Sequence, residues 1–148
     1  MRVLILSGVP GSGKSTYIAV VVRTKRAVIC SADSYFSRDG SYKFDPSLLG
    51  KAHGECIKNF IACIDSKEID VLIVDNTNTS DIEMAPYVAI AAAHGVAVDL
   101  VTLLVSPSVA HQRNLHGVSL GACSAMDRRI RARQLPPFWD ITQTTIGV

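Results

Sequence analysis

The residues with the clearest chemical meaning form the run Gly-Val-Pro-Gly-Ser-Gly-Lys-Ser-Thr at positions 8–16. This run matches the pattern G-x-x-x-x-G-K-[ST], whose glycines let loop amides approach phosphate oxygens closely. The amides, the start of the next helix and the lysine ammonium group would together meet the phosphate charge. The run therefore predicts a phosphate-binding loop that holds ATP through Gly8, Gly11, Ser12, Gly13, Lys14, Ser15 and Thr16, with the Ser15 hydroxyl on Mg2+.

The motif is informative only between a strand and a helix, and its flanking residues predict both. Residues 3–6 are a short apolar run without alternation, which is typical of a parallel strand buried on both faces. Residues 14–23 follow with helical periodicity and place Tyr17, Ile18 and Val21 on one face. The alternative, a glycine-rich turn with an incidental lysine, is disfavoured by this context.

Two aspartates follow later apolar runs and are candidates for the chemistry of phosphoryl transfer. Asp75 ends the run at 71–74, where a carboxylate could orient water or Ser15 around Mg2+. Asp33 follows the run at 27–30 and could accept the proton of an attacking hydroxyl. For both residues a structural role stays open, because an aspartate after a strand also suits a turn or a helix cap.

The order of elements predicts the fold class. Apolar strand-sized runs at 3–6, 27–30, 71–74 and 96–105 alternate with helical stretches. That alternation predicts an α/β P-loop fold, with a parallel sheet of about four to five strands flanked by helices and ligands at the carboxyl ends of the strands. Two helical stretches between residues 107 and 134 predict a helical lid. We expect residues 1–148 to form a single domain.

Positive charge and aromatic residues gather in two segments that could contact substrates. Arg113 lies in the predicted lid, where a guanidinium could stabilise charge on the transferring phosphate; the roles of Arg128, Arg129, Arg131 and Arg133 stay open. After Asp33, aromatics alternate with cations, which suits stacking on a nucleic-acid base and contact with phosphates. Tyr35, Phe36 and Arg38 are the candidate acceptor-binding residues, although such aromatics also anchor long loops against a domain.

Composition excludes several classes of protein. Hydrophobic residues make up 48% of the 148 and charged residues 19%, which is far from the composition of disordered chains. The four cysteines form no C-x-x-C pair, so neither a zinc site nor a disulfide framework is predicted. No apolar run approaches the ~20 residues of a membrane span and no signal-peptide pattern is present. We therefore expect a cytoplasmic protein without membrane contact.

Several of these segments taken together resemble the polynucleotide-kinase-like P-loop kinases, over nearly the whole chain. The matching pieces are residues 8–16, Ser-Ala-Asp-Ser-Tyr-Phe at 31–36, residues 44–53 beginning Phe-Asp-Pro, Val-Asp-Asn-Thr-Asn-Thr at 74–79, Glu-Met-Ala-Pro-Tyr at 83–87 and Arg-Asn-Leu-His-Gly-Val at 113–118. The resemblance implies that Lys14 and Ser15 bind ATP and Mg2+. It also implies that Asp33 is the general base for a 5′-hydroxyl of DNA or RNA, and that Arg113 belongs to the lid.

Two departures from the family pattern leave the acceptor open. The family member from phage has an acceptor-reading arginine three residues after the base, where this chain has Phe36, and a second lid arginine where this chain has residues 115–117. A nucleoside, a hydroxymethylated base in DNA or a small metabolite is therefore an alternative acceptor. A nucleotide-switched ATPase or regulatory module is the alternative outside the kinases.

Overall fold

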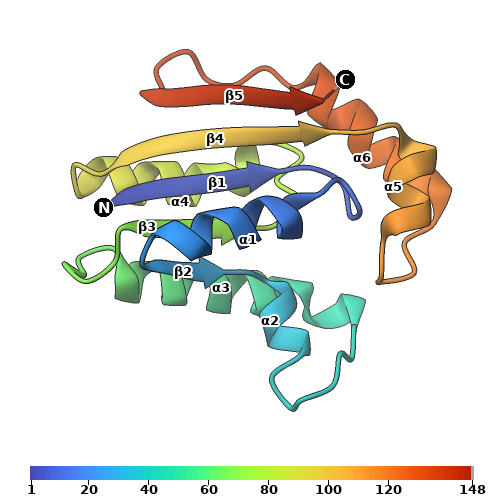
Figure 1. The fold of residues 1–148 in the computed structure, drawn as a ribbon, viewed down its shortest axis with the longest axis horizontal. Helices are drawn as coiled ribbons and strands as arrows, with labels where there is room; N and C mark the ends of the chain where they lie inside the picture. Colours follow the sequence, from blue (N-terminus) through green and yellow to red (C-terminus); the bar gives the residue numbers. More distant parts are fainter. Residues whose placement is uncertain (148) are drawn as a thin grey trace.

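The structure, a computed structural model, describes residues 1–147. Its elements run in the order β1 (Arg2–Ser7), α1 (Lys14–Thr24), β2 (Ala27–Cys30), α2 (Asp33–Phe36), a 3-10 turn (Pro46–Leu48), α3 (Leu49–Cys63), β3 (Val71–Asp75), α4 (Asp81–Ala93), β4 (Ala97–Leu104), α5 (Pro107–Arg113), α6 (Leu120–Ala132) and β5 (Ile141–Gly147). Strands and helices alternate as the sequence predicts. All five strands point toward the end of the molecule where α5 lies (Figure 1).

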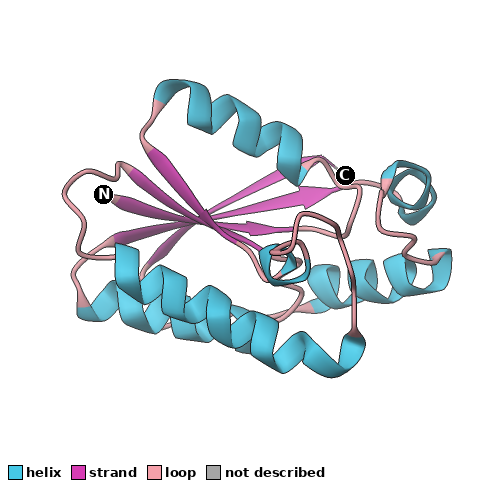
Figure 2. Ribbon diagram, turned by 90° about the horizontal axis from the view of Figure 1, so that it is seen from below, coloured by secondary structure: helices cyan, strands magenta, loops and turns pink. Residues whose placement is uncertain are grey.

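The sheet has the order β2-β3-β1-β4-β5, and every neighbouring pair is parallel. Helices cover both of its faces (Figure 2). On one face Ile18 of α1 packs over Leu4 and Leu6; on the other, Phe60 of α3 and Tyr87 of α4 are fully buried. Burial on both faces explains why β1 and β3 read as short apolar runs without alternation. The predicted fold class is confirmed.

The fifth strand is the element that the sequence analysis does not name. β5 pairs in parallel with β4 along its length, from Val98 with Ile141 to Leu104 with Gly147. Its sequence, Ile-Thr-Gln-Thr-Thr-Ile-Gly, is mostly polar because the strand lies at the sheet edge and its side chains are largely exposed. Without a buried face it carries neither an apolar run nor a clean alternation, so hydrophobic pattern does not find it.

Local capping fixes where the helices begin. Asp45 accepts a hydrogen bond from the backbone N–H of Ser47 before the turn that leads into α3, and Pro46 occupies the first turn position. Ser80 and Glu83 form a capping box at the start of α4. Both starts therefore have the side-chain caps that such positions commonly carry. Ser106 caps α5 ahead of Pro107, at the start of the segment in which the sequence predicts the lid helices.

Arg133, at the carboxyl end of α6, ties the lid helices to the sheet. Its guanidinium donates to the Ser7 hydroxyl at 2.6 Å, to the Asn78 carbonyl at 2.7 Å and to the Thr102 hydroxyl at 2.7 Å. All three acceptors belong to buried residues: Ser7 ends β1, Asn78 lies in the loop after β3, and Thr102 lies inside β4. Burial lowers the pKa of Arg133, and Glu83 opposes that effect. This residue therefore has a structural role, which the sequence left open.

Among the described residues, no helix is both long enough and apolar enough to cross a lipid bilayer.

We predict that Arg133→Met lowers the free energy of unfolding by about 2–4 kcal/mol, because three buried acceptors lose a charged donor. Arg128→Met, at an exposed position on the same helix, should stay within about 0.5 kcal/mol of the unmodified protein. Urea unfolding of both variants measures the difference. Equal stabilities would show that the Arg133 contacts do not hold the lid helices to the sheet.

Candidate active site

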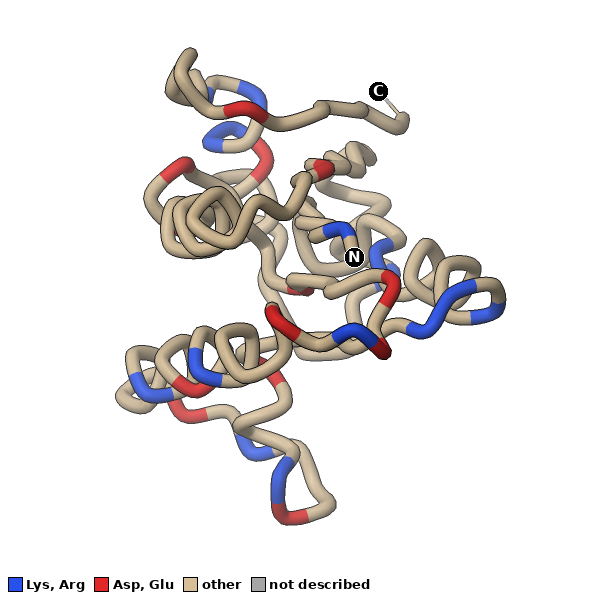
Figure 3. Tube along the Cα trace, turned by 90° about the vertical axis from the view of Figure 1, so that its left-hand side faces the viewer, with Lys and Arg blue, Asp and Glu red and all other residues tan. Residues whose placement is uncertain are grey.

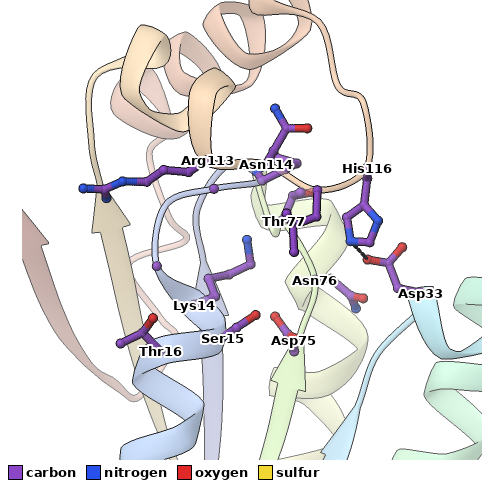
Figure 4. Close-up of a pocket in the computed structure, with 14 residues that line it drawn as sticks. Lys14, Ser15, Thr16, Asp33, Asp75, Asn76, Thr77, Arg113, Asn114 and His116 are labelled. Carbon is purple, nitrogen blue, oxygen red and sulfur yellow. Dashed lines mark ion pairs between the residues drawn. The ribbon is translucent and has the colours of Figure 1, made fainter.

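A cleft of about 530 Å³ lies at the carboxyl ends of β1, β2 and β3 and is roofed by α5 and the loop after it (Figure 4). It collects side chains from four separate parts of the chain. Its lining residues are Pro10, Gly11, Gly13, Lys14, Ser15, Thr16, Asp33, Asp75, Asn76, Thr77, Arg113, Asn114, Leu115 and His116. The structure thus brings together the phosphate-binding loop, both candidate aspartates and the candidate lid arginine.

The loop after β1 has the backbone conformation that its glycines predict. Gly11 and Gly13 have φ angles of 87° and 102°, a region that L side chains rarely adopt. Gly13 is also the residue that caps α1, and it offers no side chain to the first amides of that helix. Those amides therefore remain available to an anion at the helix start.

The same loop packs closely against α5, the first of the lid helices, and against the end of β4. A Cβ atom at Gly11 would overlap the carbonyl oxygen of Ala110 in α5, and one at Gly8 would lie 2.9 Å from the carbonyl oxygen of Leu103. The N–H of Gly8 donates to the carbonyl of Thr77 at 3.0 Å. The glycines therefore serve close packing against β4, α5 and the loop after β3, in addition to any phosphate contact.

Lys14 lies inside the loop with its ammonium group turned back on it. Its Nζ atom donates to the carbonyls of Gly8 at 2.8 Å and Val9 at 3.2 Å. Burial lowers the pKa of Lys14, while the negative charges of Asp75 and Asp33 act in the opposite direction. The Lys14 ammonium group is therefore held by backbone carbonyls and feels the negative charges of Asp75 and Asp33. A bound phosphate could replace these carbonyls as its partner.

Ser15 and Asp75 point toward one another across the floor of the cleft (Figure 4). Burial raises the pKa of Asp75, with Lys14 opposing this effect and Asp33 adding to it. Within residues 1–147, no hydrogen bond satisfies the Asp75 carboxylate, so the turn-capping alternative receives no support. A hydroxyl and a carboxylate facing each other are the hard oxygen donors that Mg2+ prefers.

Asp33 lies on the opposite wall, at the start of α2. Its carboxylate accepts a long hydrogen bond from the Tyr42 hydroxyl at 3.5 Å, and it is 3.8 Å from Nε2 of His116 in the lid loop. The rings of Tyr42 and His116 pack with centroids 4.6 Å apart. The segment that carries Asp33 is held to the loop after β3, because the side-chain oxygen of Asn76 accepts a hydrogen bond from the backbone N–H of Ala32 at 2.9 Å.

The remaining predicted residues lie less directly on the cleft. Arg113 lines it from α5, but its side chain extends away from Asp33 (Figure 4). Tyr35 and Arg38 lie outside it and stack, with the guanidinium 3.9 Å from the ring centroid. Phe36 is 5% exposed and packs in a small core with Ala32 and Ala52, so it anchors α2 instead of offering a free surface to a ligand.

Four residues that border the site receive no role of their own from the sequence: Tyr42, Asn76, Thr77 and His116. Asn76 and Thr77 belong to the polar run after β3, whose residue types suit a turn as well as a site. Tyr42 and His116 lie in irregular segments, and a lone aromatic or histidine in a loop carries no spacing signal. Only the folded chain shows that both meet at Asp33.

The fold and the site define this protein as one with a P-loop kinase fold. The solved structures similar to it include the Pnkp1/Rnl/Hen1 RNA repair complex, with a TM-score of 0.72 and 18% identity over 88% of this chain and 44% of that one. They also include a putative kinase from Chloroflexus aurantiacus, with a TM-score of 0.67 and 15% identity over 97% and 87% of the two chains. A sugar kinase from Janibacter is similar too, with a TM-score of 0.62 and 16% identity over 99% and 84%.

The chain belongs to the AAA domain family, whose model matches residues 3–116. It is also 38% identical over 122 residues to NEDD4-binding protein 2 from Homo sapiens. That match covers 78% of this chain but only 7% of the human protein. The family match covers the loop, both aspartates and Arg113.

We predict that Asp75→Asn stabilises the ligand-free protein at neutral pH, because an ionised carboxylate in a half-buried setting is removed. Since folding raises the pKa of Asp75, this residue favours the folded state only at acidic pH, and that contribution is lost as the pH rises through the folded-state pKa. The gain from the substitution should therefore shrink toward pH 4. Thermal melting at several pH values measures it.

Asp39→Asn is the matched control, because Asp39 is exposed and outside the cleft. A loss of stability in Asp75→Asn at pH 7 would contradict the electrostatic description of the cleft floor.

Proposed function

We propose that this protein is an ATP-dependent phosphotransferase that moves the γ-phosphate to the 5′-hydroxyl of DNA or RNA. One observation carries the proposal: Asp33 and the phosphate-binding loop occupy opposite walls of a single cleft that also contains Asp75 and Arg113. Phosphoryl transfer needs a held phosphate, a neutralised charge and an aligned nucleophile. The cleft offers residues for each of these tasks.

The loop and its neighbours fit ATP and Mg2+. The uncapped start of α1 and the loop amides suit phosphate oxygens, and Lys14 supplies a mobile cation. Ser15 and Asp75 would hold Mg2+, which when bound neutralises phosphate charge as the reaction proceeds. A bound cation would also relieve the burial cost that raises the pKa of Asp75.

Asp33 is the proposed general base. Its side chain is 59% exposed and so remains accessible to an acceptor hydroxyl, and its contacts with Tyr42 and His116 are long enough to be exchanged for a closer partner. Arg113 is the proposed charge-stabilising residue of the lid. Because its side chain is exposed and directed away from Asp33, it would have to turn inward when ATP binds.

A nucleic-acid acceptor is favoured by the stacked pair Tyr35 and Arg38 next to Asp33 and by the fold likeness to a protein of an RNA repair complex. Phe36 would support this side of the site through its packing. The second candidate is a kinase for a small hydroxylated substrate. It is favoured by the burial of Phe36, which removes a phosphate-reading side chain from the position that the family resemblance assigns to an arginine.

We predict that Asp33→Asn lowers the rate of transfer to a 5′-hydroxyl oligonucleotide by about 10²- to 10⁴-fold, because the proton acceptor is lost. The affinity for ATP should change little, since the residues of the loop are untouched. Labelled ATP with 5′-hydroxyl DNA and RNA, single nucleosides and sugars as acceptors measures the transfer. Equilibrium titration measures ATP binding.

Asp39→Asn serves as the control for the same chemical change at an exposed position six residues away. Labelling of nucleosides or sugars but not of oligonucleotide ends would support the small-substrate alternative. Unchanged ATP turnover in Asp33→Asn, with no acceptor labelled by either protein, would favour a nucleotide-switched ATPase over a kinase.

A further inference from the structure

A second cavity, of about 690 Å³, lies between α2 and α3, outside the cleft described above. Most of the residues that line it have a polar or charged group. The residues are Ser31, Ser34, Tyr35, Arg38, Lys51, Gly54, Glu55, Lys58 and Asn59. Three cations and one carboxylate contribute to it, so the cavity has an excess of positive charge that suits a polyanion.

The cavity adjoins the candidate base. Ser31 and Ser34 flank Asp33 along the chain on either side, and the hydroxyl of Ser31 accepts the backbone N–H of Asp33 at 3.2 Å. Asp33 itself lines the cleft that contains the phosphate-binding loop. A polymer whose end reaches Asp33 therefore has a basic cavity beside it for the residues that follow.

The two lysines of the cavity have at most one weak ionic partner in the described part of the chain. Lys51 and Lys58 are seven residues apart, two helical turns, and so share one face of α3. Within residues 1–147, Lys51 has no ion pair, and Lys58 has only a 3.5 Å contact with Glu55 between exposed side chains. A pair of that kind contributes about 0–1 kcal/mol, so a phosphate can replace it easily.

Two further features fit a nucleic-acid strand better than a small anion. Tyr35 offers an aromatic ring next to the cations, and its stacking with Arg38 fixes the guanidinium at the cavity wall. Gly54 lies in the middle of α3, where a Cβ atom would meet nothing within 4 Å, so the helix leaves open space there. Aromatic rings interleaved with a basic groove are the usual features of single-strand binding.

The global charge distribution does not reveal this site. Lys and Arg are scattered along the trace and interspersed with Asp and Glu (Figure 3), in keeping with a net charge of only +2. The local excess between α2 and α3 arises from the way that the fold brings a loop arginine to a helical face with two lysines.

We propose that the cavity between α2 and α3 binds the phosphates of a single-stranded nucleic acid just beyond its 5′ end, through Arg38, Lys51 and Lys58. This inference rests on the proposed function, because it takes the strand end to lie at Asp33. It goes further by assigning α3 to the acceptor site. The protein then prefers an acceptor several nucleotides long over a nucleoside.

The test is the salt dependence of binding to a 5′-hydroxyl thymidine oligonucleotide of about twelve nucleotides, labelled at its 3′ end, followed by fluorescence anisotropy. Three phosphate contacts predict a slope of log K against log salt of about −2, or a loss of about 18-fold between roughly 50 and 200 mM salt. The double variant Lys51→Gln with Lys58→Gln should keep about one contact and lose only about 3-fold over the same range.

The matched control is the double variant Lys25→Gln with Lys67→Gln, which removes the same charge at exposed positions outside the cavity. It should retain the slope of the unmodified protein. Glutamine preserves helix propensity, so folding is comparable across the set. Equal slopes in both double variants, or no measurable binding of the oligonucleotide by the unmodified protein, would overturn the inference.

Phosphoryl transfer, measured separately on the same proteins, distinguishes this failure from a failure of the proposed function. Transfer to oligonucleotide ends with equal slopes in both double variants would leave the proposed function standing and remove only the α3 site. Salt-dependent binding through Lys51 and Lys58 without any transfer would support the binding site and overturn the proposed acceptor chemistry.

Discussion

Parallel strand pairing is the constraint on which the rest of the molecule depends. In the order β2-β3-β1-β4, every strand delivers its following loop to the same edge of the sheet. The register places Leu6, just before the phosphate-binding loop, beside Asp75 at the end of β3, and Cys30, three residues before Asp33, beside Val74. Three chemically important segments, distant in sequence, thus become neighbours because of backbone hydrogen bonding alone.

The ligand-free site contains charges held in an unfavourable setting. Lys14 is half-buried and bonded only to loop carbonyls, and Asp75 is half-buried without a hydrogen-bond donor among the described residues. The Lys14 ammonium group and the Asp75 carboxylate each offset part of the other's desolvation cost, but burial remains the larger effect on the pKa of both. A bound triphosphate and metal ion would supply the missing partners. Stability sacrificed at such a site is a common feature of binding and catalytic clefts.

The sequence predicts those parts of the fold and site that depend on local pattern. Strands buried on both faces, such as β1 and β3, form apolar runs that can be recognised in the sequence. The glycine spacing likewise locates the phosphate-binding loop. The exposed edge strand β5 lacked such a pattern. Contacts between distant segments could not be predicted from local sequence pattern. Arg133 contacts Ser7 and Thr102, and His116 lies near Asp33, only because the fold brings these segments together. Phe36 illustrates a third limit, because an aromatic residue in a polar loop suits a ligand platform and a core anchor equally well.

The central claim is that Asp33 faces the terminal phosphate of a nucleotide held by residues 8–16. A crystal structure with a non-hydrolysable ATP analogue, Mg2+ and a 5′-hydroxyl dinucleotide tests it most directly. The account predicts that the triphosphate lies along the start of α1 and that the Asp33 carboxylate exchanges its long contacts with Tyr42 and His116 for a hydrogen bond to the acceptor hydroxyl. A carboxylate that keeps those contacts, with the acceptor hydroxyl bound elsewhere, would contradict the account.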